Sequence, residues 1–402
     1  MPQAVKNIRG RIRLYDKISP KGLDLLGEYE VGRDEIRRPD AILLRSTRID
    51  VGDYPGLWAV ARAGTGVDNI NVPVATQSGI AVFNTPGANA LSVAEITIGM
   101  IIGCYRNVIK AASFVRSVET NSEENLQKIL KARKSDFAGS ELAGKTLGVV
   151  GLGQIGVLVA NAGIKLGMRV VGYDPKPSHH NMHQLDPAVR HLKHLEYVLG
   201  EADVLTIHVP LVEKTRGLIN ADKIALMKPG SILVNYARDG IIDDDAAIQA
   251  LDTDRLSAYI TDFPTLVLRA HEKVICTPHL GASTEEAEDT CASRAVIQLK
   301  NYLELGTVVN SVNMPEVDFR LHHATVTRLA VINRDIPNMI GQITRILGEY
   351  GHNIQAMTNE SNGGVGYNLI DFEKDVPDTV VGQIKRLHGV TRVRAIRFPK
   401  AS

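Results

Sequence analysis

The stretch VVGLGQIG, residues 149–156, places glycines with the spacing G-x-G-x-x-G at the end of an apolar run. In a strand-to-helix turn, Gly151 would permit the tight bend, Gly153 would leave room for a phosphate, and Gly156 would let helix and strand pack closely. Free N–H groups at the start of the helix would then face the phosphates of a dinucleotide, whose charge the helix dipole favours. The alternative is a purely structural turn.

Asp174 ends the next apolar run, eighteen residues after Gly156, which is close to the spacing of the acidic residue in dinucleotide-binding motifs. Its carboxylate can accept hydrogen bonds from both ribose hydroxyls and would repel a 2′-phosphate. Because strand, glycine spacing, helix and acidic residue coincide, we predict a dinucleotide site. The cofactor expected there is NAD rather than NADP.

The rest of the chain gives little sign of metal, nucleic-acid or membrane chemistry. The histidine-rich stretch 178–184 lacks carboxylate partners at a metal-binding spacing, so we interpret it as a solvated loop and expect no metal. A net charge of +1 provides no long-range attraction to nucleic acid or to an anionic membrane. The apolar run 91–104 contains Glu95 and is too short to span a bilayer, which predicts a buried helix.

The cysteines and the length of the chain indicate its cellular compartment and its number of domains. Cys104, Cys276 and Cys291 are scattered and odd in number, which is typical of reduced thiols in a cytoplasmic protein. The N-terminus lacks an apolar core of signal-peptide length. With 402 residues, of which 44% are hydrophobic, the chain is expected to form two or three globular domains.

From about residue 147, runs rich in Val and Ile alternate with helical segments. Because strands covered by helices on both faces read as continuous apolar runs, this pattern predicts a doubly wound parallel α/β sheet. The first ninety residues show a weaker version of the alternation, a long helix is expected at about 283–304, and Met314 and Pro315 look like part of a linker. The expected strands are 41–46, 57–64, 80–85, 147–150, 169–174, 203–210, 231–237, 258–263 and 273–279, with helices at 92–110, 154–166 and 243–251.

The pattern changes beyond about residue 322. Apolar residues alternate over 324–333 as in a half-buried strand, and residues 337–351 have helical periodicity. A hairpin is expected around Asn362, followed by a helix at 376–388 and a strand at 390–398. The order β-α-β-β-α-β is that of the ferredoxin-like unit, which predicts a small separate C-terminal domain.

Several further motifs accompany the glycine turn. They are RAGTGVDNI (62–70), FNTPGANALSVAE (83–95), HVPLVEKTRGLIN (208–220), MKPGSILVNYARDGIID (227–243) and TPHLGAST (277–284). Together they resemble the D-isomer-specific 2-hydroxyacid dehydrogenases over roughly residues 40–305. Within that family, the chain is most similar to the branch that oxidises D-3-phosphoglycerate in serine synthesis.

The resemblance implies a domain organisation. A flavodoxin-like substrate, or lid, domain would comprise residues 1–91 and 282–314, with an NAD-binding Rossmann domain, 92–281, inserted between its parts. Residues 322–402 resemble an ACT domain, a small regulatory module that binds amino acids. The family also suggests a homodimer or homotetramer, formed through residues 92–135 and with further pairing of the C-terminal units.

The resemblance assigns two catalytic residues. His279 is the implied general acid/base, because imidazole titrates near neutral pH and can take or return the hydroxyl proton. Arg238 is the implied carboxylate-binding residue, since its planar guanidinium can form a bidentate contact beside the developing carbonyl. The alternatives are a hydrogen-bonded core histidine and a surface arginine.

Binding residues follow from the same resemblance. The substrate is expected to contact Arg45, Arg62, Gly64 and Asn89, with the two arginines at its phosphate end. Arg133 and Lys134 are candidates to reach a phosphate across a dimer interface. The expected cofactor contacts are Gly151, Gly153, Gln154, Ile155, Gly156, Asp174, Pro210, Thr215, Ala237 and Asp262.

The chain departs from the family at the residue that orients the histidine. The family places a glutamate in a D-x-F-x-x-E-P stretch, whereas this chain has TDFPTLVL, with Leu266 or Val267 at that position. Neither side chain can hydrogen-bond an imidazole. We therefore expect either slower turnover, with a lower histidine pKa, or a substitute carboxylate. Glu272 is the nearest candidate in sequence.

The same stretch leaves the nicotinamide contact open between Thr261 and Asp262. In the C-terminal unit, Asn333, Asp335 and Asn353 occupy positions at which ACT domains of the family bind serine. The stretch NRDIP, 333–337, departs from the usual pattern of that site. Serine, another amino acid, or dimerisation without an effector all remain open.

The predicted function is NAD-dependent oxidation of D-3-phosphoglycerate to 3-phosphohydroxypyruvate, the first step of serine biosynthesis. A second interpretation is a dehydrogenase for another 2-hydroxy acid, either glycerate or an apolar one. A third is an NAD(H)-sensing binding protein with weakened catalysis, which the missing glutamate suggests. No nucleic-acid or membrane partner is expected.

Overall fold

The computed structural model describes residues 9–399. The chain forms two compact units, one made of Ala90–Thr284 and the other of the residues before and after that segment. Among the described residues no single helix is long and apolar enough to cross a membrane. The helices α3 (Ala90–Tyr105) and α4 (Val108–Ser117) meet the length and composition only as a bent pair.

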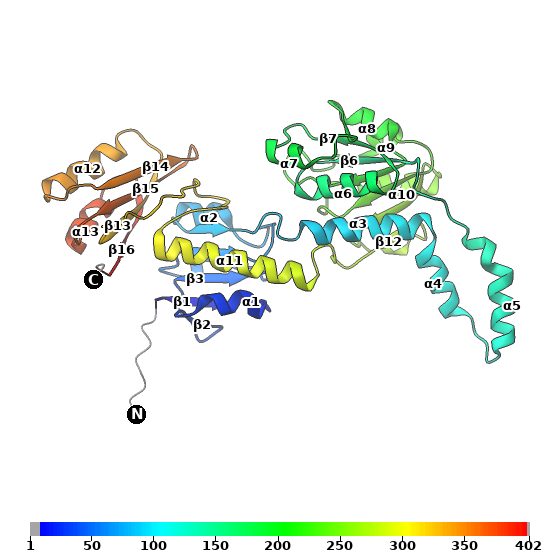
Figure 1. Cartoon of the computed structure of the whole chain (residues 1–402), viewed down its shortest axis with the longest axis horizontal. Coiled ribbons are helices and arrows are strands. Elements are labelled where there is room, and N and C mark those ends of the chain that lie inside the picture. Colours follow the sequence, from blue (N-terminus) through cyan, green and yellow to red (C-terminus); the bar gives the residue numbers. More distant parts are fainter. Residues whose placement is uncertain (1–8, 400–402) are drawn as a thin grey trace. The chain divides into compact units, whose positions relative to one another are not determined.

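The Ala90–Thr284 unit is built on a parallel sheet in the order β12-β11-β10-β9-β6-β7-β8. Strands β6, β7 and β12 of this sheet are labelled in Figure 1. Chain order reverses direction at β6 and β9, which is the doubly wound arrangement predicted from the apolar runs. The strands are β6 (Thr146–Val150), β7 (Arg169–Tyr173), β8 (Arg190–His191), β9 (Val204–Ile207), β10 (Ser231–Asn235), β11 (Leu256–Thr261) and β12 (Val274–Cys276).

Helices cover both faces of this sheet, so neighbouring strand residues enter different cores. Val149 packs on the face covered by α3 and α6, whereas Val150 packs on the face covered by α8, α9 and α10. The helices of the unit are α3 (Ala90–Tyr105), α4 (Val108–Ser117), α5 (Glu123–Arg133), η3 (Lys134–Phe137), α6 (Gln154–Lys165), α7 (His179–Gln184), α8 (Leu195–Glu201), α9 (Ala221–Leu226), α10 (Asp244–Asp252) and η4 (Leu268–Ala270).

Two predictions in this unit are wrong in detail. The helix expected at 92–110 is broken, because Asn107 adopts a left-handed conformation with φ of 51° and α4 begins after it. The histidine-rich stretch is the short helix α7 rather than a loop, and Ser178 caps it by accepting a hydrogen bond from Asn181 N. Within residues 9–399 no group of His, Cys, Asp or Glu is arranged to hold a metal ion.

The second unit contains a parallel sheet in the order β2-β1-β3-β4-β5, which is the flavodoxin-like order predicted. Its strands are β1 (Arg11–Leu14), β2 (Glu30–Gly32), β3 (Ala41–Leu44), β4 (Ala59–Arg62) and β5 (Ala81–Phe83). Its helices are α1 (Pro20–Leu23), η1 (Asp24–Leu26), η2 (Val51–Asp53), α2 (Val72–Gln77) and α11 (Glu285–Leu305). Ala292, Ala295 and Leu299 of α11 cover one sheet face.

The stretch expected to be a linker packs against β5. Met314 is 4% exposed and Asn313 is 6% exposed. The Asn313 carboxamide accepts a hydrogen bond from Val82 N (2.8 Å) and donates to Ile80 O (2.9 Å). The segment therefore satisfies the open edge of β5, which a flexible linker would leave exposed.

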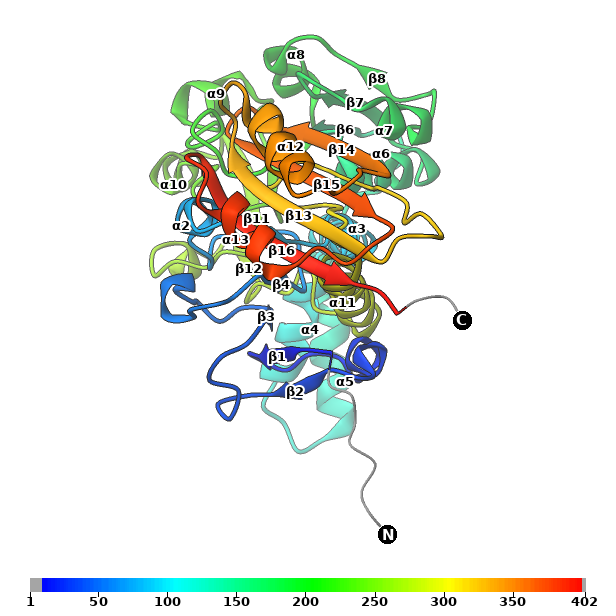
Figure 2. The same ribbon diagram turned by 90° about the vertical axis from the view of Figure 1, so that its left-hand side faces the viewer.

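The C-terminal segment forms an antiparallel sheet in the order β14-β15-β13-β16, with α12 and α13 on one face (Figure 2). The elements are β13 (Thr327–Arg334), α12 (Met339–Glu349), β14 (Ala356–Ser361), β15 (Val365–Phe372), α13 (Asp378–Lys385) and β16 (Val390–Arg397). This confirms the ferredoxin-like order. The hairpin after β14 closes through Asn362 N and Val365 O at 3.3 Å.

The other face of this sheet packs against the five-stranded unit, so the C-terminal domain does not stand apart from it. Ala330, Ile332 and Leu369 share a core with α11. Tyr367 donates a hydrogen bond to Gly306 O (2.7 Å). Trp58 is covered by the guanidinium of Arg392, which lies 4.2 Å from the indole centroid.

Candidate active site

The glycine turn has the geometry that a dinucleotide requires. Gly151 adopts φ of +95°, and a Cβ on Gly156 would lie 1.8 Å from Gly151 O, so neither position accommodates a side chain. A Cβ on Gly153 would meet nothing within 4 Å, so open space lies beside the start of α6. Backbone N–H groups at this helix terminus can bind phosphate, and the residues present fit a dinucleotide.

Asp174 follows β7 at the same edge of the sheet. Its carboxylate accepts hydrogen bonds from Leu152 N and Lys176 N, both at 2.9 Å. The first bond ties the carboxylate to the glycine turn itself. This placement suits an acidic residue that receives ribose hydroxyls next to the bound pyrophosphate.

The loop after β9 contains two predicted cofactor residues. The Thr215 hydroxyl donates to Pro210 O (2.5 Å) and accepts from Val212 N (2.8 Å), so Thr215 closes the loop upon itself. His208, which directly follows β9, was not among the predicted site residues. Its Nε2 lies 3.0 Å from Thr206 Oγ1, and its Nδ1 is buried without a partner. Burial lowers the pKa of His208 to about 3, so the ring is neutral at physiological pH.

Arg238 follows β10 in a turn held by a buried amide. Asn235, 2% exposed, donates to Arg238 O (2.9 Å) and accepts from Ala237 N (3.0 Å). The Arg238 guanidinium donates to Ala237 O (2.8 Å). Sequence reasoning missed Asn235, although its place as the last residue of an apolar strand is a signal for such a role.

His279 follows β12, on a turn with an unusual backbone. Its φ is +57°, a left-handed conformation that costs a non-glycine residue about 1–3 kcal/mol. Its N–H donates to Thr277 O (3.0 Å) and Asp262 O (3.1 Å), and its ring meets the Phe263 ring edge-on at 5.1 Å. The imidazole is thus fixed by its backbone and by an aromatic neighbour.

Asp262 has a different environment from that expected of a nicotinamide contact. Its side chain, 2% exposed, accepts hydrogen bonds from Thr277 Oγ1 (2.5 Å), Leu280 N (2.7 Å) and Gly281 N (2.8 Å). Both carboxylate oxygens are therefore occupied by the loop that carries His279. Hydrogen bonds to a charged acceptor stabilise by about 1.5–3 kcal/mol each, which is enough to offset the strain at His279.

Neither of the two residues expected at the position of the family's glutamate is an acid. Leu266 is 77% exposed and Val267 is 55% exposed. Glu272, the candidate substitute, precedes β12, whereas His279 follows it. The two residues therefore belong to opposite edges of the sheet, and Glu272 does not reach the imidazole.

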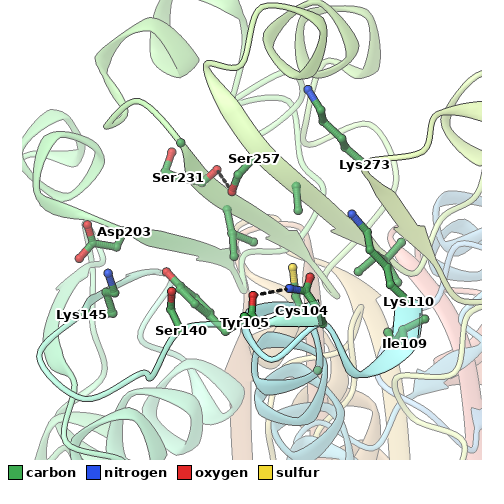
Figure 3. Close-up of a pocket in the computed structure, with 18 of the residues that line it drawn as sticks. Cys104, Tyr105, Ile109, Lys110, Ser140, Lys145, Asp203, Ser231, Ser257 and Lys273 are labelled. Carbon is green, nitrogen blue, oxygen red and sulfur yellow. Dashed lines mark hydrogen bonds between the residues drawn. The ribbon is translucent and has the colours of Figure 1, made fainter. Parts of the chain in front are cut away.

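Glu272 instead lines a cavity of about 480 Å³ at the amino ends of the strands. Lys145, Asp203 and Lys273 also line it, each just before a strand begins (Figure 3). Ligands of doubly wound sheets bind beyond the carboxyl ends of the strands. This cavity is therefore separate from the edge formed by the glycine turn, Arg238 and His279.

The predicted substrate residues lie at or after the carboxyl ends of β3, β4 and β5 in the other unit. Arg62 Nε donates to Arg45 O (2.8 Å), and a Cβ on Gly64 would lie 2.8 Å from Arg62 Nη1. Asn89 Oδ1 accepts a hydrogen bond from Thr65 Oγ1 (3.1 Å). These contacts gather Arg45, Arg62, Gly64 and Asn89 around one corner of the sheet.

Two charged residues of α11 join this corner and were not predicted. Glu288 forms an ion pair with Arg45 (2.6 Å), and Arg294 donates to Pro86 O (3.3 Å). Burial raises the pKa of the Cys291 thiol, against the opposing charges of Arg45, Arg294 and Arg62. The corner is strongly cationic apart from Glu288.

Other predicted residues have local partners. Arg133 pairs with Asp136 and lies 5.3 Å from the Phe114 ring centroid. Asn333, 4% exposed, accepts a hydrogen bond from Asn368 Nδ2 (2.7 Å). The remaining effector candidates are Asp335, which accepts from Ser361 Oγ, and Asn353, which lies between α12 and β14.

Comparison with known proteins decides the family. A family model described as "D-isomer specific 2-hydroxyacid dehydrogenase, NAD binding domain" matches residues 98–281. A D-3-phosphoglycerate dehydrogenase of Haemophilus influenzae is 32% identical over 353 residues, which cover 85% of this chain and 82% of that protein. The chain belongs to the D-isomer-specific 2-hydroxyacid dehydrogenases.

Other relatives in this family differ in length. A D-3-phosphoglycerate dehydrogenase of Methanocaldococcus jannaschii is 36% identical over 318 residues, which are 74% of this chain but only 57% of that protein. This chain thus spans little more than half the length of that relative. A hydroxypyruvate reductase of Thermotoga maritima is 34% identical over 326 residues, covering 74% of this chain and 99% of the reductase.

Solved structures of the family agree with the architecture. The NAD⁺-bound 3-phosphoglycerate dehydrogenase of Entamoeba histolytica superposes with a TM-score of 0.62 at 27% identity, covering 76% of this chain and 98% of that one. In the family's terms, the Ala90–Thr284 unit contains the NAD-binding domain, with the glycine turn and Asp174 at the carboxyl edge of its sheet.

Proposed function

We propose that this dehydrogenase catalyses the NAD-dependent oxidation of D-3-phosphoglycerate to 3-phosphohydroxypyruvate, the first step of serine biosynthesis. The observation that carries the proposal is the placement of Arg238 after β10 and of His279 after β12, two strands on either side of β11 in the sheet that carries the glycine turn. Relatives named as D-3-phosphoglycerate dehydrogenases support the choice of substrate.

In this reaction C2 of the substrate loses a hydride and its hydroxyl loses a proton. NAD⁺, when bound, accepts the hydride. His279 takes the proton and returns it in the reverse direction, which requires a neutral imidazole for oxidation and a protonated one for reduction. Arg238 holds the carboxylate with paired N–H donors and places positive charge beside the C2 oxygen.

In the proposal Arg45 and Arg62 bind the phosphate, while Gly64 and Asn89 contact the rest of the substrate. Arg45 is held by Glu288 in the structure, so the phosphate dianion would compete with that carboxylate for the guanidinium. Two guanidinium groups beside a dianion are favourable because charge-assisted hydrogen bonds are stronger than neutral ones.

The experiment is the oxidation of NADH by phosphohydroxypyruvate, followed by absorbance. We expect turnover that prefers NADH to NADPH and is lost in His279→Asn and Arg238→Met. Lys165→Met, at the exposed last residue of α6 and therefore at the far end of that helix from the glycine turn, is the control variant. NADH binding without turnover of any 2-keto acid would contradict the proposal and would support a sensing protein with weakened catalysis.

A second candidate is the reduction of hydroxypyruvate to glycerate. The full-length match to a hydroxypyruvate reductase favours it, as does the ion pair that already occupies Arg45. The two candidates differ in their need for the phosphate-binding arginines. If the double variant Arg45→Ala/Arg62→Ala raises KM equally for phosphorylated and unphosphorylated substrates, the second candidate replaces the first.

We further propose that the protein is a cytoplasmic homo-oligomer with an amino-acid effector such as serine. Helices α4 and α5 have no buried residue, and Val108 and Val115 are 53% and 48% exposed, which suits burial against a second copy. Sedimentation tests the homo-oligomer, and activity measured with and without serine tests the effector. A monomer whose activity is indifferent to serine would contradict them.

A further inference from the structure

We propose that Asp262 is the positioning residue for His279 in this chain and takes over the task of the family's missing glutamate. The inference rests on the proposed function, since it concerns the same proton transfer. It differs from the family arrangement in its route, because the carboxylate acts on the backbone of the histidine loop rather than on the imidazole ring.

The first support is the completeness of the contact. The carboxylate is 2% exposed, and it accepts from Thr277 Oγ1, Leu280 N and Gly281 N at 2.5–2.8 Å. These donors lie on both sides of His279 in sequence. A buried carboxylate needs such donors, and here all of them come from the loop that carries the catalytic histidine.

The second support is the backbone of Asp262. Its carbonyl oxygen accepts a hydrogen bond from His279 N (3.1 Å), and its N–H donates to Asn235 O (3.1 Å). Asn235 in turn donates through its side chain to Arg238 O (2.9 Å). Asp262 therefore joins the loop that carries His279 to the turn that carries Arg238.

The third support is the conformation that must be maintained. His279 has φ of +57°, which a histidine adopts only when surrounding contacts hold it there. Gly281 also fits closely, since a Cβ there would lie 3.2 Å from Asp262 Oδ2. The loop wraps around the carboxylate, and the carboxylate determines where the imidazole stands.

The test is Asp262→Asn, which preserves size but replaces one acceptor oxygen by an N–H₂ donor. That donor would meet Leu280 N or Gly281 N, both of which are donors themselves. Asp203→Asn is the matched control, because Asp203 also accepts from a backbone N–H (Thr146, 2.7 Å) but belongs to the amino edge of the sheet.

Three measurements separate positioning from stability. In Asp262→Asn we expect kcat to fall about 10- to 100-fold, as for misplaced catalytic groups, while KM values and NADH affinity stay within about 3-fold. With NADH deuterated at the transferred position, the isotope effect on kcat should rise, because the chemical step becomes slower. In the protein without cofactor, amide exchange over 277–284 should accelerate while exchange elsewhere is unchanged.

A variant that is merely destabilised would lose kcat in proportion to its NADH-binding fraction, with the isotope effect unchanged, and this would overturn the inference. Wild-type kcat and exchange in Asp262→Asn would also overturn it. Should the variant not fold, Thr277→Val keeps the carboxylate and removes one donor, and the same rise in isotope effect is required. If the wild type turns over no 2-keto acid, the proposed function fails, while loop exchange still tests the positioning.

Discussion

Breaking the buried ion pair of the C-terminal sheet should detach the C-terminal domain from the rest of its unit. Arg328 and Asp371 are both 0% exposed, and Arg328 donates to both carboxylate oxygens, at 2.6 and 2.8 Å. Arg328 also donates to Leu305 O and Phe319 O, both at 3.0 Å. One side chain thus links the sheet to the end of α11 and to the segment that follows it.

Arg328→Met should lower the stability of the C-terminal domain because it leaves buried polar groups without a partner. Asp371 would be a buried carboxylate without a cation, and the carbonyl oxygens of Leu305 and Phe319 would lose their donor. Removing one partner of a buried pair costs about 3–5 kcal/mol. This is comparable to the whole stability of a small domain, about 5–15 kcal/mol, so the C-terminal domain should be unfolded at low urea concentrations.

Tryptophan fluorescence provides the assay, because Trp58 is the only tryptophan of the chain. Its indole lies under Arg392 (4.2 Å) and Arg394 (5.2 Å), both from β16 of the C-terminal sheet. Loss of these contacts should shift the emission. In Arg328→Met we expect the change in Trp58 emission to occur at a urea midpoint lower by about 1 M or more. This follows because the free energy of unfolding falls by about 1–3 kcal/mol per M of urea.

The matched control is Arg397→Met, on the strand next to β13. Arg397 also pairs with aspartates, Asp375 at 2.8 Å and Asp378 at 2.7 Å, but it is 45% exposed. Exposed pairs contribute about 0–1 kcal/mol. Equal midpoints for Arg328→Met and Arg397→Met would refute the reasoning. In Arg328→Met with Asp371→Leu, most of the lost stability should return, because no unpaired charge stays buried.

Further predictions concern single residues. Glu288→Gln should lower KM for phosphohydroxypyruvate about 1.4- to 5-fold, since it frees Arg45 from a partly exposed ion pair worth about 0.2–1 kcal/mol; an unchanged KM would mean that the phosphate does not use this arginine. His208 has its pKa lowered to about 3, so below about pH 6.5 only the unfolded chain takes up its proton. As the pH falls from about 6.5 to about 3, the free energy of unfolding should therefore decrease by up to about 1.4 kcal/mol per pH unit. Chemical denaturation should show that this decrease is smaller in His208→Gln and unchanged in the control His191→Gln, where the histidine is exposed. Asp174→Asn should reduce the preference for NADH over NADPH about tenfold or more, because it removes a charge-assisted acceptor and a repulsion, and an unchanged ratio of kcat/KM values would contradict Asp174 as the ribose-binding residue.

The sequence was most informative where a strand is buried on both faces. Strands β6, β9 and β10 are fully buried and read as apolar runs, so they could be predicted as strands of a doubly wound parallel sheet. The short strands β1 and β2 were not predicted. The sequence RIRL of β1 alternates charged and apolar residues over only four positions, and β2 is an exposed three-residue edge strand.

Local backbone conformation explains the errors at helix ends. Apolar residues continue at Val108 and Ile109, so the hydrophobic pattern hides the break at Asn107. Asparagine tolerates a left-handed conformation better than most residues do, but periodicity alone does not reveal it. The stretch around polar Asn313 was predicted to be a linker. The hydrogen bonds that hold Asn313 in place join residues more than two hundred positions apart, so the local sequence does not reveal them.

In the candidate site, too, residues that act within one local motif could be predicted, whereas contacts between distant segments could not. The glycine turn and Asp174 were predicted because their chemistry depends on spacing within one strand–helix–strand unit. Glu272 was a candidate because it is close to His279 in sequence, but an intervening strand separates the two residues. The loop contacts of Asp262 depend on the pairing of β11 with β12, which composition and periodicity do not specify.

The exchange of a ring contact for a backbone contact has a consequence for the chemistry. A carboxylate bonded to the imidazole ring stabilises the charged ring and raises its basicity. Asp262 has its oxygens committed to Thr277, Leu280 and Gly281, so its main effect is on position. His279 should therefore keep accurate geometry without a charged partner on its ring. Because a proton enters or leaves that ring in both directions of the reaction, we expect both keto-acid reduction and hydroxy-acid oxidation to be slower than in a relative that has the glutamate.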